Sequence, residues 1–403
     1  MSIFTGKRIL LGVTGSIAAF KAADLASKLA QAGAQVDAIL TAGAEKFVTP
    51  LTFQSVTGRR AFTDADLWGG EAHVLHVGLA HTADLLVIAP CTANTLAKLA
   101  YGLADNLLTI TALASRAPLA LAPAMDGGMY DAPATQQNLA TLLSRGATII
   151  GPAEGHLASG LSGRGRMAEP TEILGHLRLA LGRSGRLAGK TIVVSAGGTQ
   201  EPLDPVRVLT NRSSGKQGYA LAQAALDMGA QVTLITTPTS LTPPIGARLV
   251  KVETAKQMLE AVVAESAQAD ALIMAAAIAD FRPKRAAASK MKKRDGIPQL
   301  TLEGTEDVLE AVARARSGKK RPRVTVGFAA ESRDLLANAS EKLKSKKLEF
   351  IVANDISAPD AGFGVETNRV TLLFADGKQE ALPLTSKSEV AETIIARVAT
   401  LLE

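Results

Sequence analysis

Short apolar runs alternate with longer segments of helical period along most of the chain. The first run, Arg8–Val13, leads through a glycine turn into residues 17–32, whose apolar positions recur with the period of an α-helix. Gly33 ends this segment, and a second apolar run follows at Gln35–Leu40. A strand, a helix and a strand in this order predict one βαβ unit, whose two strands lie parallel in one sheet.

The same order of elements begins again near residue 190. A run at residues 191–195, a long polar loop, a helical segment at residues 218–228 and a run at Gln231–Thr236 repeat the first unit. The segments LAQAGAQVDAILT and LDMGAQVTLITT resemble each other. Either the chain holds an ancient internal repeat, or the resemblance is the one that any two doubly wound units share.

Further apolar runs complete two sheets. They lie at residues 85–89, 119–122, 148–150, 271–274, 324–328 and 350–353. Their alternation with helices predicts an α/β fold with two doubly wound, largely parallel-sheet (Rossmann-like) domains. Val370–Phe374 precedes an Asp-Gly turn, which predicts an added hairpin at the edge of the second sheet. The small, basic stretch at residues 182–189 is typical of a linker, so we place the domains at residues 1–190 and 191–403.

The composition favours folded domains in a reducing compartment. Of 403 residues, 47% are hydrophobic and 20% are charged, which argues against long disordered segments. The single cysteine, Cys91, excludes an intramolecular disulfide and a CxxC site, and it indicates a cytoplasmic protein. The N-terminus lacks the long apolar core of a signal peptide, and no later run is long enough to predict a membrane span.

Three familiar motifs fail on spacing. A short-chain nicotinamide reductase needs a lysine four residues after a tyrosine, but other residues follow the tyrosines at that distance: Asp105, Ala134 and Gln223. Gly189-Lys190-Thr191 looks like the end of a P-loop, but Ser184 stands where that loop needs a glycine. Neighbouring carboxylates form no known metal-binding spacing with the clustered histidines, His73, His76 and His81.

Small and polar residues follow three strands of the first half. Gly15, Ser16 and Ile17 follow the first strand, Thr41 follows the second, and the third leads into Thr92, Ala93, Asn94 and Thr95. A helix N-terminus favours a phosphate, and open α/β sheets bind ligands at the carboxyl ends of their strands. Each loop alone would be ordinary helix capping, whereas the three together predict a mononucleotide pocket.

The first half resembles the FMN-dependent cysteine decarboxylases, specifically phosphopantothenoylcysteine decarboxylase. The resemblance is carried by HVGL at residues 76–79, by ADLLVIAPCTANTLAKLAYGLADNLLT, and by PAMDGGMY at residues 123–130. It implies that FMN takes a hydride from the carbon beside the substrate thiol, so that carbon dioxide leaves easily, and then returns it. It also implies a flavin contact at Ala124.

The resemblance implies further roles. His76 would be the active-site base or proton mediator, with a capping or core histidine as the alternative. The loop with Asp126 and Met129 would clamp the substrate carboxylate, and the glycine-rich residues 155–167 would form a mobile lid. Two positions depart from the family. Asp126 replaces an asparagine and would repel a carboxylate when ionised, and Ser159 replaces the lid cysteine that helps to protonate the ene-thiolate.

Much of the basic excess lies in the second half, after predicted strands. The net charge is +6, and lysines gather at residues 290–293 and at Lys342 and Lys346, one helical turn apart. A solvated lysine face is the ordinary interpretation of any one cluster. Several clusters at strand ends suit a triphosphate better than nucleic acid, because no DNA-binding motif is present and aromatic residues make up only 3%.

The second half resembles the bacterial, CTP-using phosphopantothenate–cysteine ligases over nearly its whole length. The resemblance implies that CTP activates the phosphopantothenate carboxylate as an acyl-cytidylate, which the cysteine amine then attacks. Asn211 would contact the acyl-cytidylate, Lys290 would neutralise phosphate charge, and Asp280 would bind CTP or its Mg²⁺. Other nucleotide contacts would be Phe328, Lys342, Lys346 and a segment that departs from the family's NPDI form, Thr305, Glu306, Asp307 and Val308.

Together the resemblances predict a bifunctional enzyme of coenzyme A synthesis that uses FMN, CTP and Mg²⁺ on 4'-phosphopantothenate and cysteine. They imply a homo-oligomer with trimeric flavin domains, dimeric ligase domains and shared sites, without nucleic-acid or membrane partners. Two alternatives stay open. One is a nicotinamide-dependent reductase, and the other is a ligase whose flavin-binding half is not catalytic, as Asp126 and Ser159 would permit.

Overall fold

A computed structural model describes most of the chain. The described residues are 2–68, 74–156, 160, 162–293, 297–316, 321–331, 334–355 and 364–403. They form two compact units, Met1–Leu181 and Gly182–Glu403, and each is treated by itself. Among the described residues, no helix has both the length and the apolar character needed to cross a bilayer.

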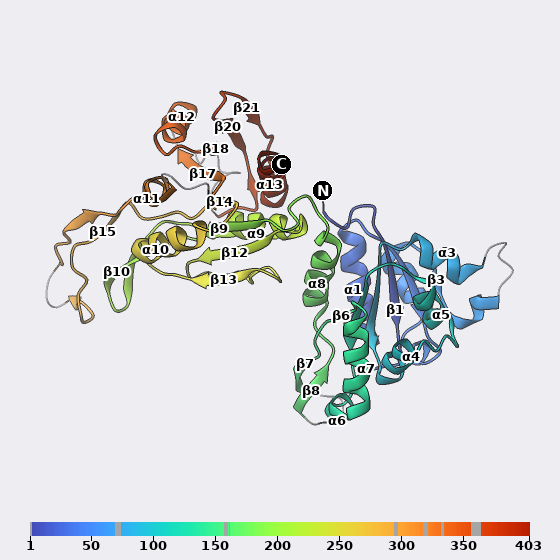
Figure 1. The fold of residues 1–403 in the computed structure, drawn as a ribbon. Helices are drawn as coiled ribbons and strands as arrows, with labels where there is room; N and C mark the ends of the chain where they lie inside the picture. The colour runs from blue at the N-terminus through green and yellow to red at the C-terminus, as the bar shows by residue number, and fades with distance from the viewer. Residues whose placement is uncertain are drawn as a thin grey trace. The chain divides into compact units, whose positions relative to one another are not determined.

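The first unit is built on one parallel sheet (Figure 1). Its order is β3 (Ala61–Phe62), β2 (Gln35–Leu40), β1 (Arg8–Val13), β4 (Leu85–Cys91), β5 (Leu119–Pro123) and β6 (Thr148–Ile149). Every pairing between these neighbours is parallel. This is the Rossmann order, and it confirms the predicted doubly wound sheet. The order reverses between β1 and β4, which is where such sheets bind ligands.

Helices cover both faces of this sheet. One face carries α1 (Ala19–Gln31), α2 (Pro50–Thr57) and α8 (Pro170–Gly182). The other carries α3 (Leu75–Thr82), α4 (Ala93–Tyr101), α5 (Leu107–Ala114) and α7 (Pro133–Ser144). Short helical turns also occur, η1 (Ala44–Lys46), η2 (Asp64–Trp68) and α6 (Gly127–Asp131).

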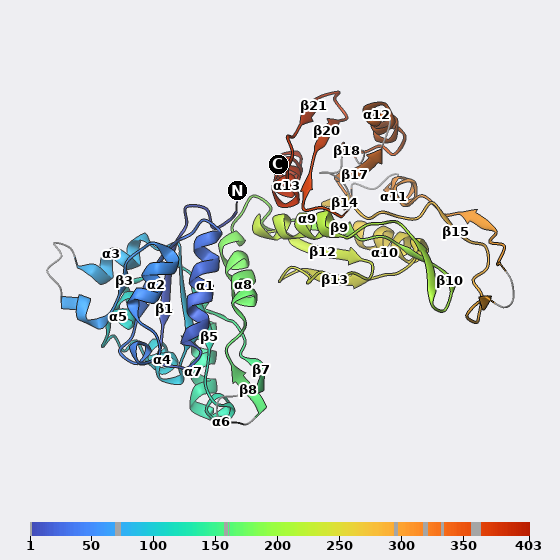
Figure 2. The ribbon, with the colours of Figure 1, turned by 180° about the vertical axis from the view of Figure 1, so that it is seen from behind.

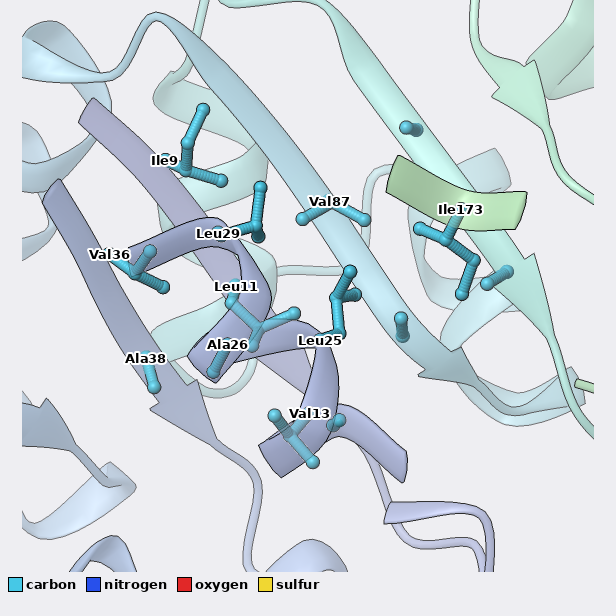
Figure 3. Packing of buried hydrophobic residues seen from close by; sticks show 14 of the residues in the cluster. Ile9, Leu11, Val13, Leu25, Ala26, Leu29, Val36, Ala38, Val87 and Ile173 are labelled. Carbon is cyan, nitrogen blue, oxygen red and sulfur yellow. The ribbon is translucent and has the colours of Figure 1, made fainter. Parts of the chain in front are cut away.

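The packing of α1 follows directly from its sequence. Leu25, Ala26 and Leu29 recur at helical spacing, are fully buried, and face Leu11 and Val13 of β1 (Figure 3). Burial of a leucine side chain stabilises a fold by about 1.5–3 kcal/mol. This packing therefore fixes the N-terminus of α1 at the carboxyl end of β1.

The second unit repeats the arrangement with two more strands. Its order is β13 (Arg248–Lys251), β12 (Gln231–Thr236), β9 (Thr191–Ala196), β14 (Ala271–Met274), β17 (Val324–Glu331), β18 (Phe350–Asp355), β20 (Val370–Phe374) and β21 (Gln379–Ala381). The strands from β13 to β18 pair in parallel, whereas β20 and β21 add an antiparallel hairpin. Both the doubly wound sheet and the edge hairpin were expected from the sequence and are confirmed.

Five α-helices lie around this sheet in the described part of the unit. They are α9 (Lys216–Asp227), α10 (Ala255–Ser266), α11 (Val308–Arg316), α12 (Leu335–Ser345) and α13 (Lys387–Leu402). One apolar cluster packs α10 and α11 against β9, β12 and β14, and another packs α12 against β17, β18 and β20.

Short antiparallel pairs lie outside the two sheets. They are β7 (Ala153–His156) with β8 (Ser162–Arg166), β10 (Gln200–Asp204) with β11 (Arg207–Thr210), β15 (Phe281–Pro283) with β16 (Leu302–Gly304), and β19 (Thr367–Asn368) with β22 (Thr385–Ser386). Both views show β10 and β15 together, extending from the sheet of the second unit (Figures 1 and 2). The sequence predicts a lid loop where β7 and β8 lie and a long polar loop where β10 and β11 lie, so these two pairs differ from the prediction.

The stretch at residues 182–189, expected as a linker, is packed against the second unit. Leu187 is fully buried, and its N–H donates to the carbonyl of Met228 at 2.8 Å. A Cβ on Gly185 would lie 2.5 Å from the same carbonyl oxygen, so the backbones approach too closely for a side chain. The second compact unit therefore begins at Gly182 and includes this stretch, while the domains at residues 1–190 and 191–403 stay a prediction.

Candidate functional site

The loops after β1 and β4 are joined at the switch point of the first sheet. The Thr14 hydroxyl donates to the carbonyl of Pro90 at 2.8 Å and accepts from the N–H of Thr92 at 3.1 Å. The loop after β2 is also close, because a Cβ on Gly15 would lie 3.0 Å from the Gly43 backbone. Three predicted loops thus meet at the carboxyl edge of the sheet.

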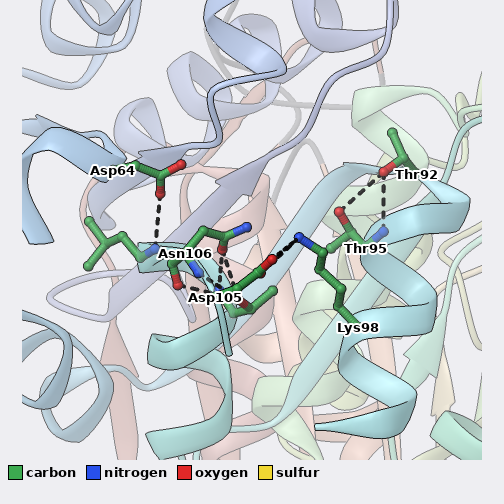
Figure 4. A network of polar contacts seen from close by, with 8 residues as sticks. Asp64, Thr92, Thr95, Lys98, Asp105 and Asn106 are labelled. Atoms are coloured by element: carbon green, nitrogen blue, oxygen red, sulfur yellow. Dashed lines mark hydrogen bonds and ion pairs between the residues drawn. The ribbon is translucent and has the colours of Figure 1, made fainter. Parts of the chain in front are cut away.

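Two predicted flavin contacts also hold the backbone at this edge, Thr92 as the N-cap of α4 and Thr41 in the turn before η1. Thr92 precedes α4, and its hydroxyl accepts from the N–H of Thr95 at 3.4 Å. The Thr41 hydroxyl accepts from the N–H of Ala44 at 3.3 Å. Further along, Lys98 pairs with Asp105 at 2.7 Å, and Asn106 caps α5 (Figure 4). The capping roles stabilise the loop that follows β4.

A cavity of about 440 Å³ opens beside these loops. It is lined by Ser16, Ile17, Ala18, Phe20, Lys21, Ala124, Met125, Asp126, His156, Gly165, Arg166 and Met167. Its walls are mostly apolar, which suits a flat ring system. Four predicted site residues lie here, Ser16, Ile17, Ala124 and Asp126. The others do not line the cavity of this chain: Gly15, Thr41, Thr92, Ala93, Asn94, Thr95 and Met129.

Asp126 already has a backbone role. It precedes α6, and its carboxylate accepts from the N–H of Gly128 at 3.0 Å. The preceding residue, Met125, donates its N–H to the carbonyl of Gly165 at 3.0 Å, which docks the β7–β8 hairpin on this loop. This hairpin occupies the predicted lid, so both ends of the lid are strands.

Two basic side chains share one carboxylate at the cavity wall. Lys21 and Arg166 approach the same oxygen of Glu169, at 2.8 Å and 2.6 Å. The hydrogen bond from Lys21 is the main reason that the pKa of Glu169 lies below its ordinary value. Lys21, Arg166 and Asp126 all line this cavity, so charged side chains of both signs stand in an otherwise mostly apolar wall.

His76 and Ser159 are not placed at this cavity. His76 is half-buried on α3, which packs on the face of the sheet opposite α1, and no residue of α3 lines the cavity. Ser159 lies outside the described residues, as does His73. The catalytic roles of His76 and Ser159 stay predictions. Cys91 is fully buried, and burial raises the pKa of its thiol, so it acts as a packing residue.

The switch point of the second sheet lies between β9 and β14. Their loops are joined by Ala277, whose N–H donates to the carbonyl of Gly197 at 2.8 Å, and by the Thr199 hydroxyl, which accepts from the N–H of Ala279 at 2.9 Å. The side-chain amide of Asn211 donates to the carbonyl of Ile278 at 3.0 Å. The polar segment after β11 is therefore fixed to the loop after β14.

These loops border a second cavity, of about 530 Å³. It is lined by residues 211–218, 275–278, Asp280, Phe328, Ala329, Lys342, Asn354, Asn368 and Lys387. Of the predicted site residues, Asn211, Asp280, Phe328 and Lys342 lie here. Side-chain oxygens of two lining residues, Oε1 of Gln217 and Oδ1 of Asn354, are buried without a hydrogen-bond partner in the described part of the chain. Such atoms favour a polar ligand.

Lysines give this cavity its charge. Lys216, Lys342 and Lys387 all line it, and Lys216 is paired with Glu366. Lys387 is almost fully buried, and burial, followed by repulsion from Lys216, lowers its pKa. A bound anion would offset the cost of holding these charges together.

Other predicted nucleotide contacts lie elsewhere. Lys346 is bound to Asp307 at 3.0 Å and to Glu310, beside a separate cavity of about 300 Å³. Val308 is buried in the core, whereas Glu306 pairs with Arg314. Thr305 lies next to the second cavity, because its N–H donates to the carbonyl of Asp280 at 3.0 Å. Lys290 is exposed on a segment that does not line the cavity.

Two family models match the chain, one for each unit. The flavoprotein model matches residues 4–180, and the model of the DNA/pantothenate metabolism flavoprotein C-terminal domain matches residues 187–402. The coenzyme A biosynthesis bifunctional protein CoaBC of Bacillus subtilis is 45% identical over 402 residues, which cover 99% of this chain and 98% of that protein. Its namesake in Mycobacterium tuberculosis is 43% identical over 408 residues, covering 98% and 97%.

The chain belongs to the bifunctional coenzyme A biosynthesis protein family. It is an enzyme with decarboxylase and ligase activities. Among solved structures, the C-terminal domain of a CoaBC protein is 39% identical and covers 54% of this chain and 98% of that chain, with a TM-score of 0.46. The FMN binding protein AtHal3 is 39% identical and covers 43% and 95%, with a TM-score of 0.39.

For this family member, sequence reasoning missed several cavity residues. Asn354 lies at the carboxyl end of the parallel strand β18, so the rule of carboxyl ends could have singled it out. Lys21, two residues into α1, and Arg166 carried no local signal. Asn368 and Lys387 reach the cavity because β19 pairs with β22 far along the chain, which no spacing reveals.

Proposed function

We propose that the second unit ligates cysteine to 4'-phosphopantothenate with CTP, and that the first unit decarboxylates the resulting 4'-phosphopantothenoylcysteine to 4'-phosphopantetheine with FMN. The observation that carries this proposal is the contrast between the two cavities. One is mostly apolar, and the other is lined by three lysines and several amides. A flavin ring suits the first, and a triphosphate suits the second.

The ligase reaction proceeds in two displacements. A carboxylate oxygen of phosphopantothenate attacks the α-phosphorus of CTP, and pyrophosphate leaves. The cysteine amine then attacks the activated carbonyl carbon, an amide bond forms, and CMP leaves with the bonding electrons. Lys342 and Lys387 stabilise phosphate charge, and Asn211, fixed by Ile278, contacts the acyl-cytidylate. Phe328 lines the nucleotide cavity.

Asp280 is the proposed contact for Mg²⁺. Its carboxylate is exposed at the edge of the cavity, and no group of three metal-binding side chains occurs among the described residues. Mg²⁺ usually binds through one or two carboxylates, water and substrate phosphates rather than in an all-protein cage. A single carboxylate beside a triphosphate site fits that preference.

FMN fits the cavity of the first unit. Ser16, Ile17 and Ala124 would contact it, close to the N-terminus of α1, where a phosphate is favoured. Bound there, FMN would supply reversible hydride transfer with the carbon beside the substrate thiol. Lys21 and Arg166 would offset the repulsion between Asp126 and the substrate carboxylate, since all three line the same cavity.

In this proposal, His76 contacts the flavin that a neighbouring subunit binds, not the flavin of its own chain. Within one chain His76 lies on α3, away from the cavity. A trimer of flavin units would place the His76 of one copy at the cavity of another, and the ligase units would dimerise. The buried, unpaired Cys91 favours a reducing, cytoplasmic setting.

The test uses the purified full-length chain. Absorbance of the desalted protein shows whether FMN is retained, and the assay supplies 4'-phosphopantothenate, cysteine, CTP and Mg²⁺. We expect 4'-phosphopantetheine. Accumulation of 4'-phosphopantothenoylcysteine would contradict the decarboxylase assignment and favour a non-catalytic flavin-binding half. Absence of the amide product would contradict the ligase assignment.

A further inference from the structure

The β10–β11 hairpin holds the segment that carries Lys290. The carbonyl of Leu203 accepts from the N–H of Ala287 at 2.9 Å. Asp204 Oδ2 then accepts from the N–H of Met291 at 3.2 Å, and the Arg207 guanidinium donates to the carbonyl of Met291 at 3.1 Å. Both backbone groups of the residue that follows Lys290 are therefore bonded to the hairpin.

Asp204 is the centre of this attachment. Its side chain is fully buried, and it also accepts from the N–H of Val206 at 2.9 Å, which closes the hairpin turn. Although burial opposes its charge, the N–H groups of Val206 and Met291 hold the pKa of Asp204 below its ordinary value. The carboxylate therefore stays ionised at neutral pH and keeps both bonds.

The same hairpin leads into the second cavity. Strand β11 ends at Thr210, and the next residue, Asn211, is bonded to the carbonyl of Ile278 at 3.0 Å. The segment with Lys290 begins beside the β15–β16 pair, where the N–H of Lys284 donates to the carbonyl of Thr301 at 2.9 Å. One short hairpin thus connects the proposed contact of the acyl-cytidylate to the exposed lysine proposed to neutralise phosphate charge.

We propose that Asp204 is a positioning residue for the ligase reaction. It fixes residues 287–291 on the β10–β11 hairpin, so that Lys290 is presented in one place relative to the end of β11. The inference rests on the proposed function through the role given to Lys290. Asp204 itself does not line the cavity, so it acts on the reaction only through the segment that it holds.

Two substitutions separate this role from folding of the hairpin. Asp204→Asn replaces one acceptor oxygen by a donor, which opposes the N–H of Val206 or of Met291. Asp204→Ser keeps an acceptor for Val206 but is too short to reach Met291, so it preserves the turn and removes the hold of the carboxylate on the segment, both the bond to Met291 and the pairing with Arg207 at 3.4 Å. Pyrophosphate release from CTP should fall about 10-fold in both, with KM for CTP changed less than about two-fold.

A double-mutant cycle decides whether the effect passes through Lys290. Lys290→Gln should lower pyrophosphate release more than about 100-fold, and adding Asp204→Ser to it should cause no further loss, because residues that act as one unit are not additive. Decarboxylation of added 4'-phosphopantothenoylcysteine should stay unchanged in all three proteins. The inference would be overturned if the losses of the two single variants multiplied in the double variant, or if Asp204→Ser released pyrophosphate at the wild-type rate.

Two matched variants control for general damage. Glu303→Gln breaks the pair with Arg282 across β15 and β16 without touching residues 287–291. Asp270→Asn removes another buried carboxylate that accepts a backbone N–H, from Thr191 at 3.0 Å. Both should keep pyrophosphate release within about two-fold of wild type. If Lys290→Gln kept the full rate of pyrophosphate release, the proposed role of Lys290 would be wrong. That result is distinct from a double-mutant cycle in which the two losses multiply.

Discussion

The two units share a strand order but differ in the charge of the cavity at the switch point. In both sheets the first six strands follow the same order, with the reversal between the first strand and the fourth. The first cavity is walled by Ile17, Phe20, Met125 and Met167, whereas the second is lined by lysines and amides. Strand order thus decides where a ligand binds, and the residues after each strand decide which ligand it is.

The largest effect is expected at Gly165, which docks the β7–β8 hairpin on the apolar cavity. Its φ is +141°, and a Cβ there would lie 2.2 Å from the carbonyl oxygen of Met125. Gly165→Val should therefore lose FMN on desalting and lower decarboxylation more than about 100-fold, while pyrophosphate release by the ligase unit is kept. Absorbance of the desalted protein measures the retained flavin, and separate assays measure decarboxylation and pyrophosphate release.

Gly163→Ala is the matched control on the same strand. No atom lies within 4 Å of a Cβ at Gly163, so flavin retention and both activities should match wild type. If Gly165→Val kept its flavin and its activity, the docked hairpin would have no part in the first site.

A smaller effect, on CTP binding, is expected to distinguish Lys342 from Lys346, for which the sequence predicts the same role. Lys342 lines the polar cavity, whereas Lys346 is bound to Asp307 and Glu310. Lys342→Gln should weaken CTP binding about 10-fold, which corresponds to loss of one charge-assisted hydrogen bond. Lys346→Gln should weaken it less than about three-fold. Calorimetric titration measures both, with exposed Lys344→Gln on the same helix as control. Equal losses at the two positions would contradict the placement of the triphosphate.

Lys387 is expected to lower the stability of the second unit and to strengthen its binding of CTP. The pKa of Lys387 is lower in the folded protein than in the unfolded chain, where it is about 10.4. The stability that comes from a neutral amine is therefore present above the unfolded pKa and is lost as the pH falls through the folded pKa. At pH 7 the charged ammonium therefore destabilises the unit. Lys387→Met should melt at a higher temperature than wild type at pH 7, by an amount that shrinks toward pH 10, and should bind CTP more weakly. A lower melting temperature at pH 7 would show that the charge is well compensated without ligand.

The smallest effect is expected at Cys91. Burial raises the pKa of its thiol, so a thiol reagent should leave the native protein unlabelled at pH 8 and label it after unfolding. Cys91→Ala should keep both activities and lower the free energy of unfolding by about 1 kcal/mol, as for a small loss of core packing. Rapid labelling of the native protein would show that the loop after β4 opens.

The apolar runs predicted the parallel strands because those strands are buried on both faces. Gln35–Leu40, Gln231–Thr236 and Ala271–Met274 have the bounds that the sequence indicated. The β10–β11 hairpin was interpreted as a loop because all four residues of β11 are exposed, so no core imposes an alternating pattern on them.

Ser16 was predicted from its place just after a strand, whereas Asn211 and Asp280 were expected from the resemblance to the ligases, and all three line the cavities. The site was missed where distant segments pair, since Lys387 reaches the second cavity through the pairing of Thr367 with Ser386. Sequence spacing also could not distinguish Lys342 from Lys346, because the partners of Lys346 come from another helix and its preceding loop.

In the proposed function, two separate sites on one chain perform consecutive steps. The most direct measurement gives Lys290→Gln two substrates in parallel: 4'-phosphopantothenate with CTP, Mg²⁺ and cysteine, or ready-made 4'-phosphopantothenoylcysteine. We expect that pyrophosphate release is lost with the first and that carbon dioxide is released at the wild-type rate with the second. Loss of both activities in a folded, flavin-containing variant would show that the two sites are not separate.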